Sequence, residues 1–386
     1  MARLWSSGIE LNWSIEGENS DRWKTTTTTV RSGTYAMHSD GPSEEASVIG
    51  HQFSASPSSD GYYLRGYFRI SSSVGSQQKI LSFASSVSTF KISIRLNTDN
   101  TLELWNDEDS VQVGSDSSAL SADTWYLIEL KVDTTTLAST AIEAKINGTA
   151  FASGTVNLAA GVDTIYLGIV EETLQGVLFV DDIALNNDSG SFQNSYPGEG
   201  EIIHLRPNAT GDNGAWTGSN TDIDEVTPDD ATTTISSSVA NNLEDVNLDA
   251  TPAALASDDT INVVQVGVRM QNNSGGTNSL TLRIKASSGG TTEESGNIAT
   301  ATAWNTNATA APRNYQLTLY DLPGASTTAW TKTDLDAAQI GAKVVTTGQS
   351  IRVSTLWLLV DHKPASVAEA VRIPQTINSI FFGTNF

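Results

Sequence analysis

The 386-residue sequence has no cysteine and few basic residues. Without cysteine, disulfides, thiolate metal sites and cysteine nucleophiles are excluded. Lys and Arg total 21 against 44 Asp and Glu, which gives a formal net charge of −23. The basic residues are shared evenly, 11 in residues 1–194 and 10 in residues 195–386, so neither half is a basic arm. An evenly anionic surface repels phosphate backbones, and nucleic acid is therefore not an expected partner.

Long hydrophobic runs are missing as well. No stretch approaches roughly 18 apolar residues, so we expect no segment that spans a bilayer and no membrane partner. The opening Met1-Ala-Arg-Leu-Trp5 lacks the apolar centre of a signal peptide, and we do not expect secretion by the usual route. A protein without such a signal still works outside the cell if lysis releases it.

Short apolar runs, separated by clusters of Gly, Asn, Asp and Ser, are what the sequence does contain. Hydrophobic residues make up 38% of the chain and nine tryptophans are spread along it, which indicates packed cores rather than disorder. This pattern predicts β-strands. We expect them at 33–38, 46–53, 62–70, 78–84, 89–96, 100–105, 110–113, 124–132, 140–147, 164–169, 176–185, 201–206, 232–236, 260–271, 278–286, 313–320 and 350–361.

Two hairpins stand out among the expected strands. Phe90–Leu96 alternates apolar with polar residues, as a strand that is solvated on one face does, and the turn-forming residues 97–100 lead into the next strand. Residues 125–132 and 141–147 are expected to form a second pair, closed by Asn147-Gly148. These local signals predict antiparallel sheets.

One short helix is predicted, over Thr333–Lys343. Thr333 is suited to its N-cap, Asp334 and Asp336 lie near its positive end, and Gly341 is suited to end it.

The chain divides at a polar, glycine-containing stretch. We expect an all-β protein with two β-sandwich (jelly-roll) domains in tandem, at 1–190 and 201–364, joined by a linker at 191–200. Because each side of the linker holds a full set of strands, we expect each half to fold on its own.

A C-terminal tail, 365–386, follows Pro364, which cannot donate a ladder hydrogen bond. The tail carries little charge and ends in an apolar group made of Ile380, Phe381, Phe382 and Phe386. Two interpretations stay open: the tail packs on its own domain, or it docks on a neighbouring subunit. Docking would make these four residues an assembly segment of a homo-oligomer.

No catalytic constellation is found in the sequence. Sandwich glycosidases present Glu-x-Asp-x-x-Glu on one strand, which places two carboxylates about 5 Å apart. That spacing is absent, and the acidic clusters 107–109, 171–172 and 181–182 consist of adjacent residues, whose side chains point to opposite faces of a strand. The four histidines fit no HExxH spacing. The sequence therefore predicts a protein that is not an enzyme and has no glycosidase activity.

Aromatic residues on the first-half strands are candidates for a sugar-binding platform, because exposed aromatic rings stack on the faces of pyranose rings. The candidates are Trp105, Tyr62, Tyr63 and Tyr67. Burial of the same side chains in the core is the alternative interpretation.

The first half resembles the concanavalin-like, laminin-G-type jelly-roll family. The resemblance rests on Trp125-Tyr-Leu-Ile-Glu-Leu-Lys-Val-Asp133, Ala144-Lys-Ile-Asn-Gly148, Tyr166-Leu-Gly168 and Phe179-Val-Asp-Asp-Ile-Ala-Leu185. It implies a jelly-roll fold over most of residues 1–190.

The opening residues 1–12 and the second half resemble structural proteins of tailed bacteriophages. In the second half the resemblance rests on Gly211-Asp-Asn-Gly-Ala-Trp216 and Ile351-Arg-Val-Ser-Thr-Leu-Trp-Leu-Leu-Val-Asp361. It implies a structural or accessory virion protein, a capsid-exterior decoration or head fibre, that contacts capsid or tail subunits. Such a protein would assemble in the host cytoplasm and leave by lysis. The alternative function is a carbohydrate-binding adhesin that contacts host glycans.

The jelly-roll resemblance also implies a cofactor. Glycan-binding jelly rolls of this architecture often hold a structural Ca²⁺ between an N-terminal Gly-hydrophobic-Glu segment and an acid on the last strand. Gly8-Ile9-Glu10 matches the first element, and Asp181 or Asp182 matches the second. Glu10, Asp181 and Asp182 are therefore the expected calcium ligands. The alternative, in which these acids only cap strand ends, stays open.

Overall fold

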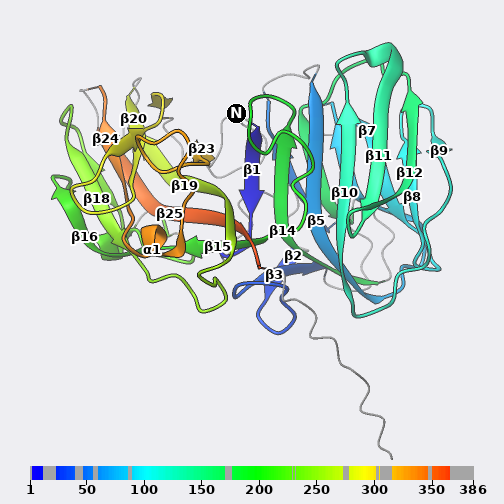
Figure 1. The fold of residues 1–386 in the computed structure, drawn as a ribbon, viewed down its shortest axis with the longest axis horizontal. Helices are drawn as coiled ribbons and strands as arrows, with labels where there is room; N and C mark the ends of the chain where they lie inside the picture. The colour runs from blue at the N-terminus through cyan, green and yellow to red at the C-terminus, as the bar shows by residue number, and fades with distance from the viewer. Residues whose placement is uncertain are drawn as a thin grey trace, which may run out of the picture.

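The protein is built from antiparallel β-sheets, which confirms the predicted all-β class of β-sandwiches. A computed structural model describes residues 2–11, 23–39, 47–54, 60–85, 89–169, 176–227, 229–230, 232–272, 278–300, 304, 315–346 and 350–365. Figure 1 shows strands β5 to β12 at one end of the molecule and β16 to β24 at the other, with β1, β14 and β15 between them. Among the described residues, no helix is long and apolar enough to cross a membrane.

Two sheets take all their strands from residues 3–187. Sheet I has the order β12-β11-β10-β5-β14-β3-β2, with β1 also paired to β14, and sheet II has the order β4-β13-β6-β7-β8-β9. Their strands are β1 (Arg3–Ser7), β2 (Trp23–Thr26), β3 (Ala36–Ser39), β4 (Ser47–Gln52), β5 (Gly61–Ser72), β6 (Gln78–Ala84), β7 (Phe90–Leu96), β8 (Leu102–Asn106), β9 (Val111–Val113), β10 (Trp125–Asp133), β11 (Thr140–Ile146), β12 (Thr149–Val156), β13 (Thr164–Ile169) and β14 (Val177–Asn187).

The other two sheets take their strands from residues 201–363. Sheet III has the order β15-β25-β19-β23, with β17 also paired to β25, and sheet IV has the order β16-β18-β24-β20-β21, with β22 also paired to β20. Their strands are β15 (Glu201–Leu205), β16 (Pro207–Gly214), β17 (Ile235–Ser237), β18 (Leu243–Leu248), β19 (Thr260–Asn272), β20 (Ser279–Lys285), β21 (Thr292–Glu294), β22 (Ile298–Ala299), β23 (Tyr315–Leu319), β24 (Gln339–Val344) and β25 (Ile351–Lys363).

The β7–β8 hairpin is confirmed, since Leu96 pairs with Leu102. Strands β10 and β11 also pair as predicted, but Asn147-Gly148 does not join them. These two residues have φ values of +50° and +77° and join β11 to β12. Positive φ at both positions is typical of a two-residue hairpin turn. A short 3₁₀ helix, η1 (Leu137–Ser139), lies between β10 and β11 instead.

The predicted helix over 333–343 is wrong in its second half. The helix α1 (Lys332–Asp336) is only five residues long, and its N-cap is Thr331, which shares a capping box with Asp334. Residues 339–344 form β24, whose alternating Ile340, Ala342 and Val344 face the core. Gly341 does not end a helix; a Cβ there would lie 1.9 Å from the Glu244 carbonyl oxygen, so the close approach of β24 to β18 requires glycine.

The two halves share an apolar interface. Trp357 and Leu359 on β25 and Ile202 on β15 belong to the core cluster of the first half, together with Trp5 on β1. All four side chains are fully buried. The outward face of sheet III is therefore covered by the first half rather than by solvent.

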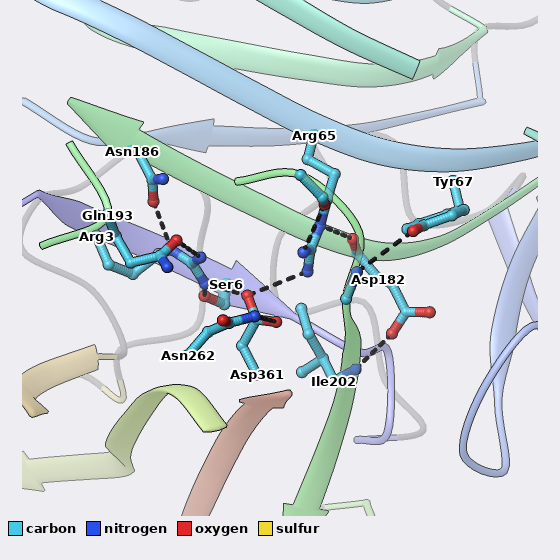
Figure 2. Close-up of polar contacts among 12 residues, drawn as sticks. Arg3, Ser6, Arg65, Tyr67, Asp182, Asn186, Gln193, Ile202, Asn262 and Asp361 are labelled. Atoms are coloured by element: carbon cyan, nitrogen blue, oxygen red, sulfur yellow. Dashed lines mark hydrogen bonds and ion pairs between the residues drawn. The ribbon is translucent and has the colours of Figure 1, made fainter. Parts of the chain in front are cut away.

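A buried ionic cluster crosses the same interface (Figure 2). Arg3 Nη1 lies 2.6 Å and Arg65 Nη2 lies 3.2 Å from Asp361 Oδ2, and all three side chains have no exposed surface. Burial by itself raises the pKa of Asp361, but the charges of Arg65 and Arg3 outweigh it and lower that pKa. The cluster therefore holds an ionised aspartate of the second half between two arginines of the first.

The predicted linker, 191–200, is fastened to the first half. Arg65 donates to the Gly198 carbonyl, and the Gly198 amide donates to Glu129 Oε1. Tyr196 donates its hydroxyl to Glu143 Oε1 at 2.9 Å. Together with the shared core and the ionic cluster, these contacts argue against independent folding of the halves. The predicted assembly residues of the tail, Ile380, Phe381, Phe382 and Phe386, lie outside the described residues.

Candidate functional site

The outward face of sheet II carries a row of neighbouring side chains. In β7, Ile92 and Ile94 belong to the core, so the alternating Lys91, Ser93 and Arg95 point away from it. Cross-strand pairing places Tyr166 beside Ser82, Ser82 beside Ser93, and Ser93 beside Trp105. The row thus has two serines at its centre and an aromatic residue at each side.

The alternation of β7 predicts that these outward-facing residues are solvated, but several of them are buried. Ser82 and Ser93 have no exposed surface and Lys91 is 5% exposed. Among the residues that the structure describes, the hydroxyls of both serines have no hydrogen-bond partner, and neither do the buried Arg95 Nε and Asp107 Oδ2 atoms. Buried polar atoms in proteins are nearly always paired, so four unpaired ones in one patch need an explanation. We call Ser82, Ser93, Arg95, Trp105, Asp107 and Tyr166 the Trp105 face.

Charge on the Trp105 face is balanced by local pairs. Arg95 Nη2 lies 2.6 Å from Asp107 Oδ1, and its guanidinium lies 3.9 Å from the centre of the Trp105 ring. The Trp105 indole nitrogen donates to Glu103 Oε2 at 2.5 Å. The charges of the face are therefore paired within it, and the Arg95 guanidinium covers one side of the Trp105 ring.

The predicted aromatic platform is not brought together. Tyr62 is 3% exposed and belongs to the first-half core. Tyr63 and Tyr67 lie on the outward face of sheet I, where Tyr196 packs at 5.1 Å from Tyr63 and the Arg31 guanidinium covers Tyr67 at 3.4 Å. Trp105 alone lies on sheet II. Its partners Ser82, Ser93 and Tyr166 were missed, because only strand register shows that they are neighbours.

The predicted calcium ligands lie around one loop. Strand β14 has a register shift between Asp181 and Ala184, and Asp182 has φ +48°, so the two aspartates do not point to opposite faces as expected. Asp181 Oδ2 accepts the Arg31 amide at 3.0 Å, and Asp182 Oδ2 lies 2.5 Å from Arg31 Nη1. The Glu10 carboxylate accepts the backbone amides of residues 34 and 35. The bulge in β14 therefore turns both Asp181 and Asp182 toward the segment that contains Arg31.

The three acids differ in how well their charge is balanced. Asp182 has Arg31 as its ion-pair partner, whereas no ion pair is found for Glu10 or Asp181 in the described part of the chain. Burial raises the pKa of Glu10 to about 7, against the opposing effect of its backbone hydrogen bonds. Burial and the charge of Asp182 raise the pKa of Asp181. Glu10 and Asp181 thus fit a divalent cation better than Asp182 does.

Calcium binding nevertheless stays a prediction. The described residues contain no group of three His, Cys, Asp or Glu side chains arranged to hold a metal ion. Calcium at Glu10 and Asp181 would need backbone carbonyls or water to complete its six to eight oxygens.

If calcium binds there, EDTA should lower the melting temperature and added calcium should restore it, because a ligand of the native state adds stability. The double variant Glu10→Gln/Asp181→Asn should lose this response, whereas Asp133→Asn, a change at a half-buried acid on β10, should keep it. Thermal unfolding followed by calorimetry measures both. Equal melting temperatures of the unmodified chain in EDTA and in calcium would contradict the prediction.

Comparison with known proteins gives similar folds but no family. No family model and no curated protein matches the sequence. Among solved structures, an endo-β-1,4-glucuronan lyase from the fungus Trichoderma reesei is 12% identical, with a TM-score of 0.37 over 48% of this chain and 95% of the lyase. A carbohydrate esterase of the Shiga toxin-encoding bacteriophage phi24B is 14% identical, with a TM-score of 0.33 over 44% of this chain and 88% of the esterase. The alginate lyase Aly36B is 10% identical, with a TM-score of 0.33 over 45% of this chain and 87% of the lyase.

These similar structures overturn one prediction. They are carbohydrate-active enzymes, which contradicts the prediction that the chain is not an enzyme, and we withdraw it. The physical flaw was to search for carboxylates along single strands. Acids from different strands can share a face: the pairing of β10 with β11 places Glu129 and Glu143 on the outward face of sheet I. At 10–14% identity the similarity concerns the fold and assigns no reaction to this chain.

Proposed function

We propose that the protein binds carbohydrate chains at the Trp105 face. The observation that carries the proposal is the patch of four buried, unpaired polar atoms on Ser82, Ser93, Arg95 and Asp107, next to the Trp105 ring. Leaving such an atom unpaired costs about 1–3 kcal/mol. Because the four atoms have no exposed surface in the free protein, a ligand recovers this free energy only when it moves the covering side chains aside and pairs with these atoms.

Carbohydrate matches the chemistry of the patch better than other ligand classes. The serine hydroxyls both donate and accept, Arg95 Nε donates, and Asp107 Oδ2 accepts. Sugar hydroxyls also donate and accept, and the C–H face of a pyranose packs on an indole. A phosphate ligand would meet the Asp107 carboxylate, which disfavours it.

Replacing Trp105 by alanine should weaken binding of an oligosaccharide about tenfold or more, because it removes the aromatic contact. The test is titration calorimetry with cellohexaose, xylohexaose, laminarihexaose and a tetragalacturonate, together with an assay for chain cleavage. Phe192→Ala is the matched control, since Phe192 is an exposed aromatic residue outside the face.

Replacing Ser93 by alanine distinguishes a binding role from a structural role. Removing an unpaired buried hydroxyl should leave the free protein as stable as before or more stable, while binding weakens. A residue with a purely structural role would lower stability and leave affinity unchanged. Unchanged affinity in both Trp105→Ala and Ser93→Ala would refute the proposal.

The virion role, the concanavalin-like family and the capsid or tail partners stay predictions from the sequence resemblance. No observation on the described residues bears on them. A cryo-EM map of a native particle that locates this chain is the experiment that addresses them.

A further inference from the structure

A cleft of about 440 Å³ lies where the two halves and their connecting segment meet. The first half lines it with Arg31, Trp125 and Asn147, and the connecting segment lines it with Glu199 and Gly200. Residues 364–365, which follow β25, complete the lining. From this lining we infer a second carbohydrate site that accepts a neutral sugar unit. Its volume falls within the roughly 300–1,000 Å³ that ligand pockets occupy.

The lining combines an aromatic surface with polar groups. Trp125 is half-buried and lies on the outward face of sheet I beside Leu127. The Asn147 side-chain oxygen accepts the Leu127 amide at 3.0 Å, and no described residue accepts a hydrogen bond from its NH₂ group, which is available to a ligand. The Glu199 carboxylate, 68% exposed, supplies acceptors from the connecting segment. A ring that stacks on the indole therefore meets both donors and acceptors.

Charge in the cleft is already compensated, which favours an uncharged ligand. Arg31 is paired with Asp182 at 2.5 Å, and Glu199 lies 3.4 Å from Lys363 Nζ. A phosphate or a polycation would have to displace one of these partners. A neutral sugar only adds hydrogen bonds.

The walls of the cleft are held before any ligand arrives. Arg31 Nη1 donates to the Gly200 carbonyl at 2.9 Å, and the Gly200 amide donates to the Tyr67 hydroxyl at 3.4 Å. Figure 2 shows Tyr67 beside Asp182 and the ionic cluster. A preformed site loses little entropy on binding.

This second site is separate from the Trp105 face. Trp125 lies on the outward face of sheet I, whereas Trp105 lies on the outward face of sheet II, on the other side of the first-half core. One molecule could thus hold a sugar chain at two places, which would raise its avidity for a polysaccharide. The inference does not depend on the proposed function, because different variants test the two sites.

The test measures binding of maltose, cellobiose, lactose and xylobiose, with digalacturonate as the charged comparison, by calorimetry on the full chain. In the Trp105→Ala background, at least one neutral disaccharide should still bind. Adding Trp125→Ala should weaken that binding tenfold or more, and adding Asn147→Asp should weaken it severalfold. Asn147→Asp keeps the oxygen that accepts the Leu127 amide and tolerates the positive φ, so it tests the NH₂ group without disturbing the turn.

Three outcomes would overturn the inference: no neutral disaccharide binds, binding is unaffected by both cleft variants, or digalacturonate binds more tightly than the neutral sugars. Loss of binding only in Trp105→Ala would contradict the cleft and support the Trp105 face. Loss of binding only in Trp125→Ala would contradict the Trp105 face and support the cleft.

Discussion

Replacing Asp361 by asparagine should lower the free energy of unfolding by about 3–5 kcal/mol. The change leaves Arg3 and Arg65 buried without their counter-ion, and neither side chain has exposed surface through which to reach water. Urea unfolding at neutral pH measures the loss. Because Asp361 belongs to the second half and both arginines to the first, the effect should extend to both halves.

Two further variants test whether the loss of stability comes from leaving a buried charge unpaired. Glu199→Gln removes an exposed ion pair with Lys363 and should change stability by less than about 0.5 kcal/mol. The triple variant Arg3→Met/Arg65→Met/Asp361→Leu removes the whole cluster and should recover part of the loss seen in the single variant, since no unpaired charge remains. An Asp361→Asn protein as stable as the unmodified chain would show that the cluster does not hold the halves together.

Replacing Trp357 by alanine should cost about 3–5 kcal/mol, as expected for a fully buried large aromatic side chain. Trp357 lies on β25 of the second half but belongs to the core cluster of the first half, and it stacks parallel to His204 with ring centres 6.4 Å apart. The cavity should therefore loosen strands on both sides of the interface.

Hydrogen exchange followed by mass spectrometry shows which strands are affected. Trp357→Ala should reduce protection in β1 and β14 as well as in β19 and β25. Trp330→Ala is the matched control, because Trp330 is buried in the second-half cluster alone and should affect that half first. Loss of protection confined to the second half in Trp357→Ala would contradict a shared core and favour two independently folding domains.

Sequence patterns predicted the strands that carry many apolar residues. Phe90–Leu96 and residues 350–361 were found because their core-facing residues are large and alternate or run together. Strands β12 and β16 were missed because their residues are mostly small or polar, and pairing with neighbours rather than hydrophobicity places them in sheets. Residues 339–344 were misjudged because a short apolar segment next to a good N-cap fits a helix and a strand equally well.

The candidate sites depend on contacts that a single sequence does not show. Arg3 pairs with Asp361, although 358 residues separate them in the sequence. The turn-rich segment 191–200 is typical of a solvated linker in the sequence, yet it is hydrogen-bonded to the first half. The row from Tyr166 to Trp105 crosses four strands, and a shift of one residue in β6 or β7 would turn its serine into the core. Trp105 alone was found from the sequence, because its aromatic character needs no register to be noticed.

A crystal structure of the protein with a bound hexasaccharide tests carbohydrate binding at the Trp105 face most directly. We predict density for a sugar ring over the Trp105 indole, with sugar oxygens or ordered waters within hydrogen-bond distance of the Ser82 and Ser93 hydroxyls and of Asp107 Oδ2. Density for the saccharide elsewhere on the molecule, with the outward face of sheet II empty at saturating ligand, would contradict the account.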